Sequence, residues 1–189
     1  SNNNIIGGAT AGARNVISGN NGFGIYLTPR ANGNQVLGNY IGTSANGLTA
    51  LANEAPGIII EGGQNNQIGG TAAGTGNLIS GNEASGIHIV SLAGPAANGN
   101  RIEGNRIGTN AAGTAPLPNG NGMATLYGNS GVSIVGATNT IVGGTAAGAG
   151  NLISGNGAFG VYVRDNGSYA ATGNRIEGNF IGTNASGAA

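Results

Sequence analysis

The residues of this chain that could do acid–base chemistry are few. The 189 residues include six Arg, six Asp or Glu, one His and no Cys. Glu103 and Glu177 stand in matching contexts, each two residues after an Arg (Arg101 and Arg175). Two carboxylates about 5–10 Å apart can hydrolyse a glycosidic bond. The alternative, which we favour, is a pair of solvated surface ion pairs that contribute little to stability.

The other titratable residues match no catalytic or metal-binding pattern. His88 falls within Gly86-Ile-His-Ile89, at an alternating position that predicts a surface location. We therefore predict no catalytic residue, no metal site and no cofactor. The zero net charge argues against binding to nucleic acid or to an anionic membrane. No apolar run approaches the roughly 18 residues that a membrane span needs.

A repeated module is the strongest signal in the sequence. Asn77-Leu-Ile-Ser-Gly-Asn82 recurs in two other places, and a sister version, Asn-x-Ile-Gly-Thr-(Asn/Ser), falls between the copies. The six copies cover residues 15–20, 39–44, 77–82, 105–110, 151–156 and 179–184. Self-similarity of this kind is typical of repeat architectures.

Each repeat predicts three short strands. The first is a Gly-Ile-x-Ile segment, the second is Asn-x-Ile, and the third is the module itself. These segments alternate β-branched residues in the manner of strands, and no stretch has helical periodicity. We predict an all-β, right-handed parallel β-helix with three strands per coil, essentially no helix, and five complete coils plus a partial one. We expect residues 1–189 to form one solenoid segment that starts in mid-coil and carries no amphipathic cap. We expect an excerpt of a longer repeat protein or a subunit that stacks end to end.

The module assigns each residue a structural role. Its Ile points into the core, its Ser faces out, and Gly-Asn turns the chain. Side-chain amides at corresponding corners of successive coils can bond to one another as a ladder. We predict one ladder from Asn15, Asn39, Asn77, Asn105, Asn151 and Asn179. A second is predicted from Asn4, Asn34, Asn66, Asn100, Asn139 and Asn174.

The pattern resembles the right-handed parallel β-helix of the pectate-lyase-like superfamily. More narrowly, it resembles Asn-Gly-rich repeats of large bacterial secreted and cell-surface proteins. The resemblance covers the whole chain and is carried by Ile68-Gly-Gly-Thr-Ala-Ala-Gly74, by 76–82 and by 104–118. It implies the fold, whereas its members include enzymes on acidic polysaccharides, adhesins, phage spikes and passive stalks. The Asp-Asp, Gly-His-Gly and Asp-Pro-His motifs of the enzymes are absent.

Two outward surfaces are candidates for contact with a partner. On the first strands, we predict a glycan-binding surface from Tyr26, Ile59, Glu61, His88, Tyr162 and Arg164. On the third strands, the outward residues are Val16, Tyr40, Leu78, Arg106, Leu152 and Phe180. Such an apolar strip is unusual if bare. We expect a Gly-Thr-Ala-Ala-Gly loop or a partner chain to cover it.

These observations favour a non-catalytic, structural or adhesin-like module that is secreted or exposed on a bacterial cell surface. Its expected partner is a polysaccharide or cell-surface glycan, with end-to-end or lateral self-association as a further possibility. The alternative is an incomplete carbohydrate-active β-helix with catalytic groups elsewhere. Ice binding through Thr43, Thr109 and Thr183 is a remote alternative, because these residues recur only in every second coil. We expect any function of this segment to lie in its outward aromatic residues and in the insertion Met123–Ser130.

Overall fold

The structure is a computed structural model that describes residues 1–92, 94–120 and 128–188. Its regular elements are seventeen short strands and one turn of 3₁₀ helix, η1 (Ala11–Ala13). This confirms the all-β prediction. Within the described ranges, no helix has the length and apolar character that crossing a membrane requires.

The strands form three parallel sheets, which we call A, B and C. Sheet A comprises β1 (Ile5–Gly7), β4 (Gln35–Leu37), β7 (Gln67–Gly69), β10 (Arg101–Glu103), β13 (Ile141–Gly143) and β16 (Arg175–Glu177). Sheet B comprises β2 (Val16–Ile17), β5 (Tyr40–Ile41), β8 (Leu78–Ile79), β11 (Arg106–Ile107), β14 (Leu152–Ile153) and β17 (Phe180–Ile181). Sheet C comprises β3 (Ile25–Leu27), β6 (Ile58–Glu61), β9 (Ile87–Val90), β12 (Val132–Val135) and β15 (Val161–Arg164).

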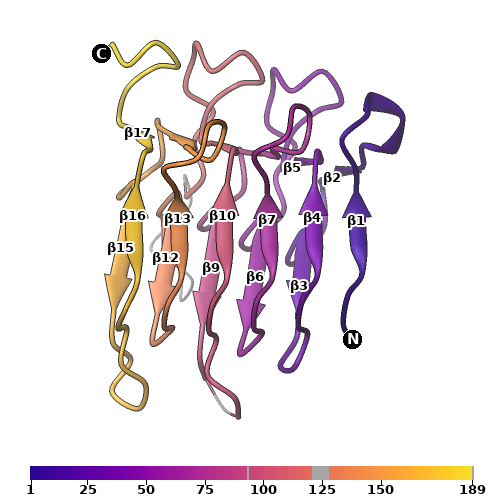
Figure 1. Ribbon diagram of the computed structural model, residues 1–189. Coiled ribbons are helices and arrows are strands. Elements are labelled where there is room, and N and C mark those ends of the chain that lie inside the picture. The colour runs from indigo at the N-terminus through magenta and orange to yellow at the C-terminus, as the bar shows by residue number, and fades with distance from the viewer. Residues whose placement is uncertain (93, 121–127, 189) are drawn as a thin grey trace.

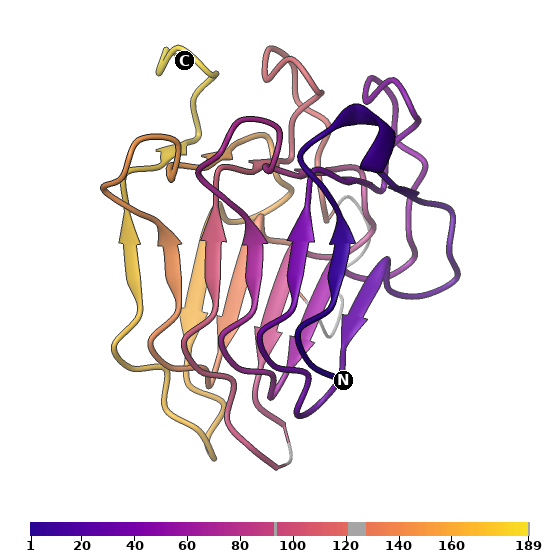
Figure 2. The ribbon, with the colours of Figure 1, turned by 45° about the vertical axis from the view of Figure 1, so that its right-hand side comes forward.

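The chain visits sheets A, B and C in turn, so each circuit is one coil of a parallel β-helix. Five coils contribute all three strands, and β16 and β17 belong to a sixth, as predicted. Sheets A and C are two walls whose strands run in opposite directions, and the short strands of sheet B bridge them (Figures 1 and 2). The coils wind in a right-handed sense from the N-terminus to the C-terminus (Figures 1 and 2).

Aliphatic side chains from all three sheets fill the interior. Val36 and Ile68 from sheet A, Ile41 and Ile79 from sheet B, and Ile58 from sheet C are fully buried in one cluster. The module Ile therefore points inward, as predicted. Because one coil supplies only a few such residues, each coil depends on its neighbours to bury them.

The corner between sheets A and B carries the first predicted Asn ladder. Asn105 shows the pattern: its Oδ1 accepts hydrogen bonds from the backbone N–H of Asn77 (3.0 Å) and from the Asn77 Nδ2 (2.9 Å). Its own Nδ2 donates to the Ile68 carbonyl one coil back, at 2.9 Å. The same bonds recur along the A–B ladder, which confirms the prediction for Asn15, Asn39, Asn77, Asn105, Asn151 and Asn179.

The corner between sheets C and A carries the second ladder, with one correction. Asn4, Asn34, Asn66, Asn100 and Asn174 occupy the column, but Asn139 does not. The register pairs Arg101 with Ile141, which places Thr140 next to Asn100. Asn139 instead lies one residue earlier, in a left-handed conformation at φ 51°. The prediction failed there because the Asn-x-Ile pattern selects Ile141 as the inward residue and hence Asn139 as the corner, whereas the buried residue is Val142.

A third ladder occupies the corner between sheets B and C. Asn82 Oδ1 accepts a hydrogen bond from Asn53 Nδ2 at 2.8 Å, and Asn82 Nδ2 donates to Asn119 Oδ1 at 2.8 Å. The B–C ladder comprises Asn20, Asn53, Asn82, Asn119 and Asn156. The module pattern by itself predicts only a turn at its last Asn. Asn53 and Asn119 lie outside any module, so the sequence shows no regular pattern for this third ladder.

The module Ser is buried at Ser80 and partly buried at Ser18 and Ser154, so the expectation that it faces out is wrong for Ser80. Ser80 is 0% exposed; its hydroxyl donates to the Thr109 carbonyl at 2.8 Å and accepts from the Gly108 N–H at 3.0 Å. Strand β8 ends at Ile79, so strand alternation does not extend to Ser80. The hydroxyl instead joins neighbouring coils at the start of the turn.

Candidate functional site

Loops that follow the Ile-Gly-Thr modules cover part of the outer face of sheet B, whereas Val16 and Phe180 at its ends stay 45% and 49% exposed. Loops 43–50, 109–116 and 183–188 project from the sheet-B end of the molecule (Figure 1). They are joined to one another, since the Ala111 N–H donates to the Gly47 carbonyl at 3.0 Å. Leu78 and Leu152 are therefore only 3% and 6% exposed.

The loops that cover this strip are not the ones we expected. The backbone at Gly47 lies so close to Leu78 that an added Cβ would meet the Leu78 Cδ2 at 2.8 Å, and Gly113 lies as close to Leu152. The Gly-Thr-Ala-Ala-Gly loops instead stack on one another, with Gly148 against the Thr71 carbonyl. Thr43 and Thr109 are also buried.

The outer face of sheet C is largely buried in its centre. Ile59 and His88, two members of the predicted glycan surface, are 2% and 5% exposed. Ile59 packs in a small apolar cluster with Val90 and Val135, and Phe23 packs against it. The expectation that His88 is a surface residue is wrong. Burial, together with the positive charge of Arg164, lowers the His88 pKa to about 4.

The remaining predicted residues of that surface lie at opposite ends of sheet C. Tyr26, on β3, is 44% exposed and donates a hydrogen bond to the Glu61 carboxylate. Tyr162, on β15, stacks on Phe159 with ring centroids 5.2 Å apart. The exposed Arg164 also lies on β15, and its guanidinium donates to the Asp165 carbonyl. The structure thus divides the six residues into two separated groups with a buried centre.

The insertion Met123–Ser130, which we expected to contribute to function, falls mostly outside the described residues. Only its end, from residue 128, is described.

Sheet A presents the accessible β-surface. Its first outward column consists of Ile5, Gln35, Gln67, Arg101, Ile141 and Arg175, all exposed or partly exposed. Between β10 and β16 this face holds a pocket of about 400 Å³. Arg101, Glu103, Arg175 and Glu177 line it, with Ile141, Thr71 and Thr145. This pocket is the candidate site.

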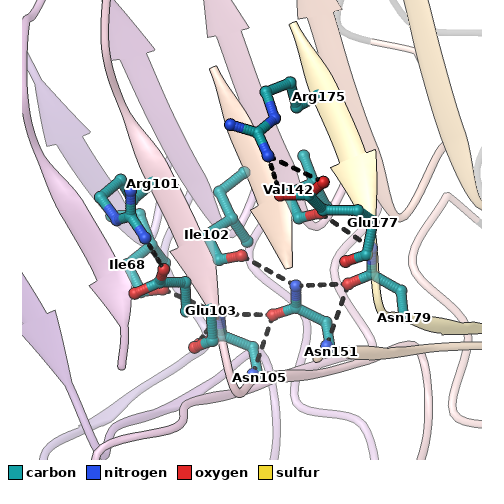
Figure 3. Close-up of polar contacts among 10 residues, drawn as sticks. All are labelled: Ile68, Arg101, Ile102, Glu103, Asn105, Val142, Asn151, Arg175, Glu177 and Asn179. Atoms are coloured by element: carbon teal, nitrogen blue, oxygen red, sulfur yellow. Dashed lines mark hydrogen bonds and ion pairs between the residues drawn. The ribbon is translucent and has the colours of Figure 1, made fainter. Parts of the chain in front are cut away.

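Two Arg–Glu ion pairs define the pocket (Figure 3). Arg101 contacts the Glu103 carboxylate through Nη2, and Arg175 Nη2 lies 2.7 Å and 3.0 Å from the two carboxylate oxygens of Glu177. Both Arg side chains are open to solvent, with 48% and 61% of their surface exposed. The Glu103 side chain is only 5% exposed. We expected a solvated pair there, but the loops on either side enclose this carboxylate.

The A–B ladder holds the backbone of both Glu residues. Asn105 Nδ2 donates to the Glu103 backbone carbonyl at 2.9 Å, and Asn179 Nδ2 donates to the Glu177 carbonyl at 3.0 Å (Figure 3). Asn105 and Asn179 both bond to Asn151, on the coil between them (Figure 3). The two ion pairs are therefore held on one rigid scaffold, two strand spacings or roughly 9–10 Å apart.

Glycines in the intervening coil leave the pocket open. The position between the two Glu residues is Gly143, at φ 86°, followed by Gly144. An added Cβ at Gly143 would lie 2.0 Å from the Glu177 carbonyl oxygen, so a side chain is excluded. Across the described parts of the chain, no three His, Cys, Asp or Glu side chains gather as metal ligands. The two ion pairs of the pocket therefore offer hydrogen-bond donors and acceptors, and the apolar Ile141 lies beside them.

Comparison with protein-family models, with curated proteins and with solved structures finds no match to this chain.

Proposed function

We propose that this chain is a non-catalytic structural segment, adhesin-like in character, of a secreted or cell-surface bacterial protein. In this proposal it belongs to the pectate-lyase-like β-helix proteins and contacts saccharides through an outer face. The likeness of its Asn-Gly repeats to those of large secreted and surface proteins supports this location.

The observation that carries the structural role is the presence of an Asn ladder at each corner of the coil. Asn39, Asn77 and Asn53, for example, are 0–2% exposed and bond to the coils on both sides. Hydrogen bonds between buried amides are costly to break singly, because each leaves a buried polar group without a partner. A chain joined in this way at three corners suits a rigid spacer.

The structural role is tested by amide hydrogen exchange. We expect the ladder N–H groups of Asn39, Asn77 and Asn105 to exchange only on global unfolding, whereas loop amides such as Asn46 exchange quickly. If the ladder amides exchanged as fast as the loop amides, the coils would open individually and a rigid spacer would be ruled out.

The second candidate function is a carbohydrate-active β-helix. It is favoured by one observation, that Glu103 and Glu177 line the same pocket. Their spacing of roughly 9–10 Å approaches the separation in inverting glycosidases. Screening uronate and neutral polysaccharides for depolymerisation and for unsaturated products separates the two. We expect no turnover. Turnover abolished by Glu103→Gln or Glu177→Gln would establish the enzyme instead.

A further inference from the structure

We propose that the pocket between the two Arg–Glu pairs on sheet A binds a neutral saccharide, which lies across Ile141. This inference rests on the saccharide contact in the proposed function and assigns to it a site and a ligand class.

The register across β10, β13 and β16 determines the shape of the site. Ile141 lies between Arg101 and Arg175 in the first outward column. In the parallel column, Gly143 stands between Glu103 and Glu177, and the next residue, Gly144, lines the pocket. A ligand in the pocket therefore meets a charged pair on each side and an aliphatic side chain in the middle.

The hydrogen-bonding groups match a polyhydroxylated ligand. A guanidinium has five N–H donors, and Arg101 uses one of them on Glu103. A carboxylate has about four acceptor sites, so Glu177, whose side chain is 30% exposed, retains free ones. Neighbouring hydroxyl groups of a sugar can donate to a carboxylate while accepting from the guanidinium. Thr71 and Thr145 add hydroxyl groups at the loop side, and Ile141 can pack against the C–H face of the ring.

The charge balance favours a neutral ligand over an acidic one. Each Arg is already in contact with a Glu, so the four charged groups of the pocket sum to zero. The whole chain also has zero net charge. An anionic ligand would gain attraction from each Arg but suffer repulsion from the Glu beside it. Binding should accordingly depend little on salt concentration.

The corresponding place one repeat earlier has a different lining, which gives an internal comparison. There Gln67 stands in the position of Ile141. Gln35 and Leu37 stand where Arg101 and Glu103 do, and the Arg101–Glu103 pair itself takes the place of the second pair. The Gln67 amide reaches over Gly70, where an added Cβ would meet its Nε2 at 2.9 Å. Gly144 is the equivalent of Gly70 in the later repeat. An added Cβ there would lie 3.1 Å from the Ala149 Cβ and 3.9 Å from the Glu103 Oε1, and no other described residue, its chain neighbours apart, would come within 4 Å. Ile141→Gln should therefore close the pocket with a residue that this fold already accepts.

The test is calorimetric titration of the chain with neutral gluco-, manno- and galacto-oligosaccharides and with uronate oligomers of matched length. We expect at least one neutral oligosaccharide to bind, with an affinity that changes by less than about threefold between low and high salt. Because a hydrogen bond to a charged group contributes about 1.5–3 kcal/mol, Glu177→Gln should weaken binding about tenfold or more. Ile141→Gln should abolish it.

Matched controls separate the site from general effects. Glu54→Gln makes the same chemical change as Glu177→Gln, but on an exposed loop. Gln67→Ile makes the reverse of the Ile141→Gln exchange, in the repeat before the pocket. Both should bind like the parent chain. Thermal unfolding of each variant establishes that it is folded. If Glu177→Gln is not folded, Arg175→Gln replaces it as the test of the second ion pair.

Each remaining outcome contradicts a different statement. Tighter binding of uronates with a steep salt dependence would overturn the ligand class. Neutral binding that survives both Glu177→Gln and Ile141→Gln would overturn the site but leave saccharide contact intact. No binding to any saccharide would overturn this inference and the saccharide contact together, while the exchange experiment would still decide the structural role.

Discussion

Thr140 lies beside Asn100 in the C–A ladder, in a column that otherwise carries Asn. Its backbone N–H still donates to Asn174 Oδ1 at 2.9 Å. Its hydroxyl is buried and has no hydrogen-bond partner in the described part of the chain. The side-chain ladder is thus interrupted between Asn100 and Asn174.

Replacing Thr140 with Asn should complete this ladder. The new Oδ1 would accept from the backbone N–H and Nδ2 of Asn100, as Asn100 itself does for Asn66. We expect the free energy of unfolding to rise by about 1 kcal/mol, measured by chemical denaturation. Thr140→Val, which removes the unpartnered hydroxyl without building a bond, is the control. A Thr140→Asn variant no more stable than Thr140→Val would show that the interruption costs nothing.

Removing one rung of the intact A–B ladder should be strongly destabilising. Asn105→Ala leaves the Asn77 amide groups and the Ile68 carbonyl without their partner. Because these groups are buried, we expect a loss of about 2–4 kcal/mol in the free energy of unfolding. Asn46→Ala, on an exposed loop, should cost less than about 1 kcal/mol. Equal losses in the two variants would argue against the ladder as a source of stability.

The close approach of loop 43–50 to sheet B depends on Gly47. This residue has φ 68°, and an added Cβ would meet Ala111, Leu78 and Tyr40 at 2.7–3.0 Å. Gly167 has a similar φ of 87° but open space around it. We expect Gly47→Ala to destabilise the fold by about 1–2 kcal/mol more than Gly167→Ala, because only the first adds a steric clash to the backbone strain. Parallel denaturation curves measure the difference; if the two losses were equal, the loop would not be packed on the sheet.

Burial of His88 predicts a pH-dependent stability. Its pKa is lowered to about 4 from the ordinary value of 6.5, first by desolvation and then by Arg164. Between these two values the unfolded chain binds a proton that the folded chain does not, so stability rises with pH across this window. We expect a loss of about 3 kcal/mol on acidification from pH 7 to below pH 4.

The variant His88→Gln isolates this effect from the titration of carboxylates in the same range. Its unfolding free energy, measured from pH 7 to pH 4, should fall less steeply than that of the parent chain. Identical slopes would contradict the assignment to His88.

The coil architecture could be read from the sequence because it depends on local spacing. Ile79 and its equivalents recur at fixed positions in the module, and inward Ile columns follow directly from strand alternation. The A–B ladder followed for the same reason, since its Asn always stands two residues before that Ile. At Asn139 and Thr140 two assignments fit the spacing, and the sequence pattern alone predicts the wrong residue for the C–A ladder.

The sequence by itself determined the solenoid, its inner columns and one complete ladder, because each of these is a property of a single repeat copied along the axis. Only the tertiary structure decided which outer face is open. Loop 43–50 covers Leu78, the face around His88 is buried, and sheet A remains accessible at Arg101 and Arg175. Which loop lies over which sheet depends on contacts between coils that are distant in sequence, and such contacts leave no periodic signal. The candidate site is therefore formed by the two Arg–Glu pairs of sheet A and not by the aromatic face that the sequence predicts.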